Sequence, residues 1–138
     1  MLVQDYMTSP AITIAVSALW KDASLTMRQH SIRHLPVVNL DGRLVGIISE
    51  RDILKTTPAP ATEAMWELTY LLERYQVGDM MSKTVITVTP QSTIQEAGRL
   101  MVEHKIGALP VVDETGNVVG MISEIDLLNL LLDMVGRD

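Results

Sequence analysis

The chain has 138 residues, of which 47% are apolar and 20% are charged. This length suits one ordinary globular unit or two small units that share a core. Acidic residues outnumber basic ones by 17 to 11, and Lys and Arg form no cluster, which argues against a nucleic-acid-binding face. The absence of cysteine excludes a disulfide framework and a thiolate metal site.

Signals for secretion or membrane insertion are missing from the sequence. The first ten residues lack the basic start and the continuous apolar core of a secretion signal. The longest apolar run, residues 127–135, is interrupted by Asn129 and Asp133 and falls short of the ~20 residues that span a bilayer. We therefore expect a cytoplasmic protein without a membrane partner.

An internal repeat organises the chain. Residues 3–54 align with residues 77–128 without a gap and share many identical positions. A unit of ~50 residues buries too little surface to be stable alone. The two copies should therefore pack on each other, and we expect a pseudo-two-fold axis between them.

Each copy is predicted to begin with a strand and a helix. The short β-branched stretches 11–14 and 85–88 indicate the strands. In the second copy, Ser92 and Gln95 have the spacing of a capping box at a helix start. The equivalent helix of the first copy is expected to begin near Ser17. Its buried face should carry Trp20, Ala23 and Met27, and that of the second copy Ile94, Ala97, Leu100 and Met101.

Two further strands are predicted in each copy, and a helix follows them. The strands are 35–38 and 44–48 in the first copy, and 109–112 and 118–122 in the second. A glycine in the connecting turn supplies the positive φ that a hairpin needs. The order is therefore strand, helix, strand, strand, helix, which is a mixed α/β (α+β) class.

The repeat boundaries suggest three parts: a first repeat at 1–57, a helical insert or linker at 58–76 and a second repeat at 77–138. Within the insert, residues 62–76 have the apolar spacing of a helix, which either packs over the module edge or binds a partner. The helix that begins at Glu124 is apolar nearly all round. Such a helix must be buried on more than one side, so we expect a homodimer through the terminal helices.

The stretch Gly46–Asp52, GIISERD, returns as Gly120–Asp126, GMISEID. Each copy leads from an apolar strand into a helix start, which leaves unpaired backbone N–H groups where an anion such as phosphate can bind. The alternative is a plain capping box, in which the Ser and Asp side chains satisfy the helix end. His30 and His104 are expected to cap helix ends or to pack there, and the histidines come with no metal-ligand set.

The combined motifs resemble those of a known family. They are an HxIxxLPVV element at His30–Val38 and His104–Val112, a DG or TG turn, a VGxIS strand and the Ser-x-x-Asp helix start. Together they resemble the cystathionine-β-synthase (CBS) domain, and two copies resemble a CBS pair, or Bateman module. The IRHLPVV stretch and the LLNLLLDMVGRD ending resemble stand-alone bacterial CBS proteins of the acetoin-utilisation type.

The resemblance implies tandem β-α-β-β-α repeats with two clefts for adenosine derivatives such as AMP, ADP, ATP or S-adenosylmethionine, and no covalent cofactor. In the family, the Asp of the motif takes the ribose hydroxyls, the Ser approaches the phosphate, the first strand contacts adenine, and basic residues before Leu-Pro read phosphate. The implied nucleotide-binding residues are Ala11, Ile12, Thr13, Arg33, His34, Leu35, Pro36, Ser49, Arg51, Asp52, Val85, Ile86, Thr87, Leu109, Pro110, Ser123 and Asp126.

The two copies differ in charge around the motif. The first has Arg33, His34 and Arg51, whereas the second has Gly107, Ala108 and Ile125 at the matching positions. We therefore expect the first cleft to prefer phosphorylated adenosine, and the second to be empty, weaker or suited to a less charged ligand. Lys83, Lys105 or charge from the other copy remains an alternative source of a cation for the second cleft.

The residue patterns and the family resemblance together imply a regulatory adenine-nucleotide-binding module that senses energy or metabolite state, is not an enzyme, and acts on an unknown partner protein. No general base or metal set accompanies the site, which disfavours nucleotide chemistry. Two alternatives stay open: a ligand-free dimerising scaffold for protein–protein interaction, and a module that binds S-adenosylmethionine rather than AMP, ADP or ATP.

Overall fold

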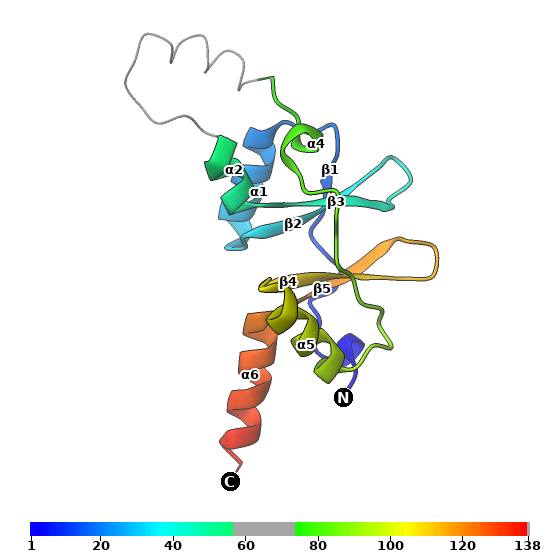
Figure 1. Cartoon of the computed structure of the whole chain (residues 1–138), viewed down its shortest axis with the longest axis vertical. Helices are drawn as coiled ribbons and strands as arrows, with labels where there is room; N and C mark the ends of the chain where they lie inside the picture. The colour runs from blue at the N-terminus through cyan, green and yellow to red at the C-terminus, as the bar shows by residue number, and fades with distance from the viewer. Residues whose placement is uncertain (57–73, 138) are drawn as a thin grey trace. The chain divides into compact units, whose positions relative to one another are not determined.

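A computed structural model describes residues 1–56 and 74–137 and divides the chain into two compact units. One unit, here the N/C unit, combines residues 1–12 with 86–138. The other, the middle unit, consists of residues 13–85. Both units mix helices and strands, as Figure 1 shows. The predicted mixed α/β class is confirmed.

The middle unit contains a three-stranded sheet in the order β1-β2-β3. Strand β1 runs parallel to β2, and β2 runs antiparallel to β3. Its elements are β1 (Ile14–Ala15), α1 (Trp20–His30), β2 (His34–Val38), β3 (Leu44–Ser49), α2 (Glu50–Thr56) and α4 (Val77–Met80).

The N/C unit repeats this plan with an antiparallel pair of strands, β4 and β5. Val88 adds a single parallel bridge to Val111, at the place that β1 occupies in the middle unit. The elements are the 3-10 helix η1 (Val3–Asp5), α5 (Ile94–His104), β4 (Ala108–Val112), β5 (Val118–Ser123) and α6 (Glu124–Val135).

The core of each unit lies between the central strands and the helices packed on them, and it includes Val3 of η1 in one unit and Val77 of α4 in the other. The inward side chains of β2 and β4, such as Leu35 and Leu109, are fully buried. Ala23 and Met27 of α1, and their counterparts in α5, are buried as the helical spacing predicts. The repeated apolar pattern therefore forms two equivalent cores.

Several predicted boundaries are corrected. The strand predicted at 11–14 is shorter and lies later, at Ile14–Ala15, because only these residues pair with β2. The strand predicted at 85–88 is reduced to the isolated bridge of Val88. Helix α1 begins at Trp20 rather than near Ser17, since Leu19 is held in an extended bridge with Gln76. Helix α5 is capped one residue later than predicted.

The cap of α5 is Thr93, whose Oγ1 accepts from the backbone N–H of Glu96 at 3.1 Å. The hydroxyl of Ser92 instead accepts from the backbone N–H of Thr89 at 3.0 Å. At the other ends, α1 and α5 finish at His30 and His104, as expected. In the last turn of each helix, the carbonyls of Met27 and Arg28 in α1 and of Met101 in α5 accept from the backbone N–H of the left-handed residue that follows the helix.

The first segment of each repeat lies in the unit built by the other repeat. The backbone N–H of Val3 donates to Ser92 O at 2.8 Å, and that of Val77 donates to Ala18 O at 2.7 Å. Thr8 likewise forms an antiparallel bridge with Met121 of β5. The repeats of the sequence and the compact units of the fold therefore differ at their starts.

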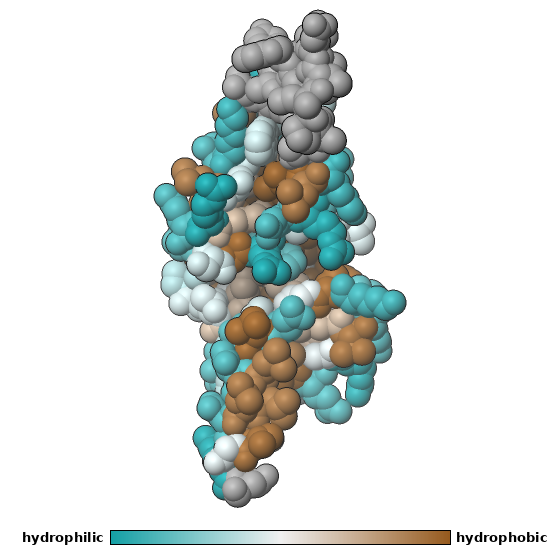
Figure 2. All heavy atoms as spheres, turned by 90° about the vertical axis from the view of Figure 1, so that its left-hand side faces the viewer, coloured by the Kyte–Doolittle hydropathy of each residue, from teal (hydrophilic) through white to brown (hydrophobic). Residues whose placement is uncertain are grey.

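Helix α6 carries a row of exposed apolar side chains. None of its residues is buried, and Leu128, Leu132 and Val135 are all at least half exposed. Figure 2 shows apolar side chains gathered over this helix. The predicted insert helix at 62–76 lies outside the described residues, except for its last three. No helix in the described ranges is long and apolar enough to cross a bilayer.

Candidate functional site

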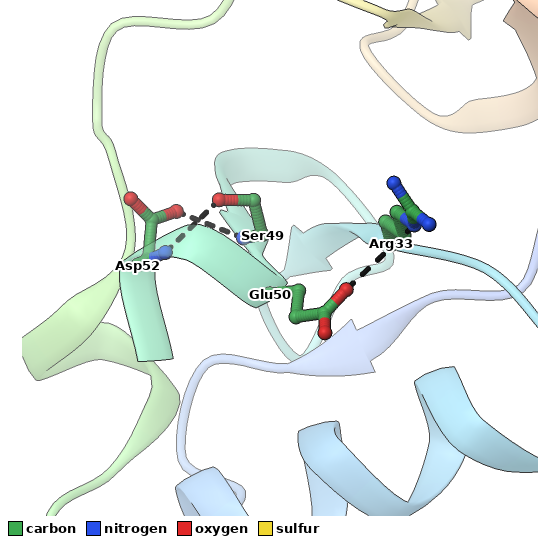
Figure 3. A network of polar contacts seen from close by, with 4 residues as sticks. All are labelled: Arg33, Ser49, Glu50 and Asp52. Carbon is green, nitrogen blue, oxygen red and sulfur yellow. Dashed lines mark hydrogen bonds and ion pairs between the residues drawn. The ribbon is translucent and has the colours of Figure 1, made fainter. Parts of the chain in front are cut away.

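The Ser-x-x-Asp motif of the middle unit joins β3 to α2. The backbone N–H of Ser49 donates to Asp52 Oδ2 at 2.8 Å, and the backbone N–H of Asp52 donates to Ser49 Oγ at 3.1 Å (Figure 3). This is a reciprocal capping box, which satisfies backbone donors at the start of the helix. The capping interpretation of the sequence is therefore confirmed at this motif.

The N/C unit builds the same corner between β5 and α6. Ser123 is the N-cap residue, and its backbone N–H donates to Asp126 Oδ2 at 2.8 Å. The Ser123 hydroxyl also donates to this oxygen, at 3.1 Å. In both motifs these bonds use Oδ2 of the aspartate. A carboxylate accepts about four hydrogen bonds, so a cap and a ligand contact are compatible on one side chain.

Strand direction brings the predicted adenine segment into the sheet from the side that carries the motif. Strand β1 is parallel to β2, with Ile14 opposite Val37, so the chain enters β1 at the end where β2 begins. His34, the first residue of β2, pairs with Ser49, the last residue of β3. The chain therefore runs through Thr13 into β1 from the side of the sheet that carries the motif, although Ile14 itself lies opposite the fourth residue of β2.

The N/C unit has the same arrangement. Val88 bridges Val111 in parallel, and Ala108 at the start of β4 pairs with Ser123 at the end of β5. The chain therefore reaches Val88 through Thr87 from the side that carries the second motif, although Val88 itself bridges the fourth residue of β4. In each unit, the residue before Leu-Pro and the motif serine are paired at one end of the sheet.

The remaining predicted site residues divide between the units. Arg33, His34, Arg51 and Val85 belong to the middle unit, and Ala11, Ile12 and Ile86 belong to the N/C unit. The Leu-Pro pairs lie in the cores: Leu35, Pro36, Leu109 and Pro110 are fully buried. Those four side chains thus hold the strands in place beside each motif.

The glutamate within each motif was not among the predicted site residues. Arg33 Nε lies 3.7 Å from Glu50 Oε2 (Figure 3), and both side chains are mostly exposed, at 83% and 58%. Such an exposed pair is weak, so an incoming anion can replace the glutamate. The sequence signal was the identity of Glu50 and Glu124 in the two copies.

The second glutamate has a different neighbour. The backbone N–H of Glu124 donates to Gly107 O at 2.9 Å, as that of Glu50 does to Arg33 O. A β-carbon added to Gly107 would lie 3.1 Å from Glu124 Oε1. The Glu124 carboxylate therefore lies over the position at which the first repeat has arginine.

Comparison with known proteins agrees with the repeat and with the fold. The family model for the CBS domain matches residues 3–58 and again 77–133. A CBS domain-containing protein of Dictyostelium discoideum is 33% identical over 135 residues, which cover 97% of this chain and 93% of that protein.

Solved structures show the same architecture. A Vibrio cholerae protein assigned to acetoin utilization (AcuB) matches with a TM-score of 0.82 and 30% identity, over 99% of this chain and 93% of that one. The CBS domain pair of protein MJ0100, solved with 5′-methylthioadenosine and S-adenosyl-L-methionine, matches with a TM-score of 0.80 and 28% identity, over 100% and 98%. The Arabidopsis thaliana protein CBSX2, solved in complex with AMP, matches with a TM-score of 0.79 and 28% identity, over 96% of this chain and 97% of that one.

The internal repeat, the two matched segments and the likeness over nearly the whole of both chains lead to one assignment. The chain belongs to the CBS-domain family and carries a pair of CBS domains.

Proposed function

We propose that the protein is a non-catalytic regulatory module that binds adenosine derivatives at the motifs of Ser49–Asp52 and Ser123–Asp126. The observation that carries the proposal is the pair of equivalent corners, in each of which the motif carboxylate lies at the end of the sheet where the residue before Leu-Pro pairs with the motif serine. Similar CBS pairs solved with AMP, or with 5′-methylthioadenosine and S-adenosylmethionine, support this ligand class.

The residues have distinct roles in this proposal. The carboxylates of Asp52 and Asp126 accept hydrogen bonds from the ribose hydroxyls. Arg33, released from its exposed pair with Glu50, binds phosphate in the first cleft as a planar fork of N–H donors. Regulation follows when the ligand prefers one of two arrangements of the protein, and the partner protein distinguishes them.

A thermal shift experiment tests the binding. At 100 times the dissociation constant, a ligand adds about 2.7 kcal/mol to stability and should raise the melting temperature by several degrees. We expect at least one of AMP, ADP, ATP, 5′-methylthioadenosine and S-adenosylmethionine to do so. Asp52→Asn and Asp126→Asn keep an oxygen that can cap the helix, so they should reduce the ligand shift with little change in the melting temperature of the free protein.

A matched control is Asp41→Asn, in the exposed β2–β3 turn of the middle unit, which should leave the ligand shift unchanged. The proposal fails if none of the five compounds moves the wild-type melting temperature. It also fails if the double variant Asp52→Asn/Asp126→Asn keeps the full shift, because the ligand then binds elsewhere.

The exposed face of α6 supports a homodimer as a second element of the proposal. Ile125, Leu128, Leu132 and Val135 recur at spacings of three and four and are all at least half exposed. This spacing places them on one stripe of the helix, as in a helix–helix seam. A second copy that brings the same stripe would cover it by two-fold symmetry.

Sedimentation equilibrium tests the dimer. We expect the wild type to be a dimer at micromolar concentration and Leu132→Lys to be a monomer, since a buried unpaired charge opposes the seam. Leu40→Lys, in an exposed turn of the middle unit, is the matched control and should remain dimeric. A monomeric wild type, or a dimeric Leu132→Lys variant, would refute the proposed homodimer through α6. Dimerisation without any nucleotide binding would instead favour the scaffold alternative.

A further inference from the structure

The described charges around the two motifs differ in balance. The first motif has two cations, Arg33 and Arg51, beside two carboxylates, Glu50 and Asp52. The second keeps both carboxylates, Glu124 and Asp126, but has Gly107, Ala108 and Ile125 in place of the residues before Leu-Pro and within the motif. The same corner is therefore close to neutral in the middle unit and negative in the N/C unit.

The positions of the glutamates make this difference larger. Glu50 has an arginine within 3.7 Å, which offsets its charge. Glu124 takes part in no ion pair among the described residues, and its carboxylate lies over Gly107, where a β-carbon would be 3.1 Å from Oε1. In the second repeat an unneutralised carboxylate thus lies beside the backbone position from which the first repeat extends a guanidinium.

The helix start does not reverse this balance. Helix α6 has Glu124 and Asp126 in its first turn and no basic residue there. Acidic side chains in the first turn already compensate the partial positive charge of the helix end. Lys105, the nearest basic residue before Gly107 in the sequence, ends α5 in a left-handed conformation and is exposed. A phosphate group here would meet two carboxylates, and like charges in contact oppose binding.

We propose that the second motif selects adenosine derivatives whose 5′ group carries no negative charge, and that Glu124 is the residue that disfavours phosphate. This inference rests on the proposed function and specifies the ligand class of one of its two clefts. This selectivity does not affect the proposed ribose contact through Asp126, because adenosine derivatives with a neutral or cationic 5′ group have the same ribose hydroxyls. The two clefts then bind different compounds, a phosphorylated one at Arg33 and an unphosphorylated one at Glu124.

Titration calorimetry on the full chain tests the selectivity with two probes, AMP and 5′-methylthioadenosine. The Asp52→Asn variant weakens the first motif, so binding reports on the second. There we expect 5′-methylthioadenosine to bind at least about tenfold tighter than AMP at low salt, the effect of one unit charge at a partly exposed site. Adding Glu124→Gln to the Asp52→Asn variant should increase the affinity for AMP several-fold and leave the affinity for 5′-methylthioadenosine unchanged. The preference should shrink at high salt, because exposed charges are screened.

The mirror experiment uses the Asp126→Asn variant, in which binding reports on the first motif. Arg33→Gly introduces the residue of the second repeat. It should weaken the binding of AMP without changing the affinity for 5′-methylthioadenosine. Conversely, the double variant Gly107→Arg/Asp52→Asn gives the second motif the cation of the first. It should reduce the preference of the second motif for 5′-methylthioadenosine over AMP. Glu114→Gln, a charge removed from the exposed β4–β5 turn of the same unit, is the control and should change neither affinity.

The outcomes separate the two proposals. Binding of neither probe to any form of the protein would overturn the proposed function, and this inference with it. If the first motif binds AMP while the second binds both probes equally, or binds neither, the inference is overturned and the proposed function stands. The same holds if Glu124→Gln leaves the ratio of the two affinities unchanged.

Discussion

Gly120 lies where the N-terminal segment crosses β5, and replacing it with alanine should destabilise the protein. A β-carbon on Gly120 would lie 2.7 Å from Met7 Sδ and 2.9 Å from Thr8 O. The methionine end can move, but the Thr8 carbonyl is fixed, because Thr8 and Met121 exchange backbone hydrogen bonds of 2.8 and 3.0 Å. Overpacking of this kind costs about 1–3 kcal/mol.

Part of that cost is offset, because alanine lowers the conformational entropy of the unfolded chain, which stabilises the folded protein by about 0.4–1 kcal/mol. A net loss of roughly 1–2 kcal/mol should lower the melting temperature by about 3–8 °C for a chain of this size. Hydrogen exchange gives the local readout: the Thr8 and Met121 amides should lose more protection than amides of the β2–β3 pair, where the substitution has no contact.

Gly98→Ala is the matched control and should have the opposite sign. Gly98 lies inside α5, and its added β-carbon would meet only Leu127 Cδ1 at 3.5 Å, an ordinary contact. Alanine is better than glycine in a helix by about 0.5–1 kcal/mol, so this variant should be more stable. Should Gly120→Ala match or exceed the wild-type melting temperature, the close contact of the N-terminal segment with β5 would be refuted.

Three further changes test other parts of the structure. Ser123→Ala removes the hydroxyl that caps α6 and should cost about 1 kcal/mol in chemical denaturation; an unchanged midpoint would contradict the capping box. Leu109→Ala opens a cavity at a fully buried site and should cost about 2–5 kcal/mol, whereas Leu128→Ala, at 51% exposure, should cost far less in the monomer; equal losses would contradict the core. The hydrogen bond from the Thr115 hydroxyl, followed by backbone bonds, lowers the pKa of Asp113. The ionised Asp113 carboxylate therefore stabilises the fold above the ordinary carboxyl pKa, and this contribution is lost as pH falls through the lowered pKa. In acid, the wild type should lose stability relative to Asp113→Asn. Asn39 forms the equivalent turn with an amide oxygen, so Asp113→Asn should fold normally, and parallel pH profiles would refute the shift.

Local patterns were sufficient to predict both motifs. Ser49 and Asp52 are three residues apart, and so are Ser123 and Asp126, so each capping box closes within one helical turn and needs no distant partner. The helix faces followed from the same local periodicity. The start of α1 was misplaced because Gln76, a residue far along the chain, holds Leu19 extended. Neighbouring residues gave no sign of that bridge.

The sequence by itself determined the repeat, the order of its elements and the residues at each strand-to-helix corner. Only the tertiary structure decided which unit takes the first segment of each repeat. Val3 and Val77 are equivalent residues, as are Ala18 and Ser92, so the sequence allows a segment to pair within its own copy or across to the other. Val3 bonds to Ser92 and Val77 to Ala18, so the pairing is crosswise. Repetition makes the two pairings nearly equal in local chemistry, and the choice therefore depends on the path of the whole chain.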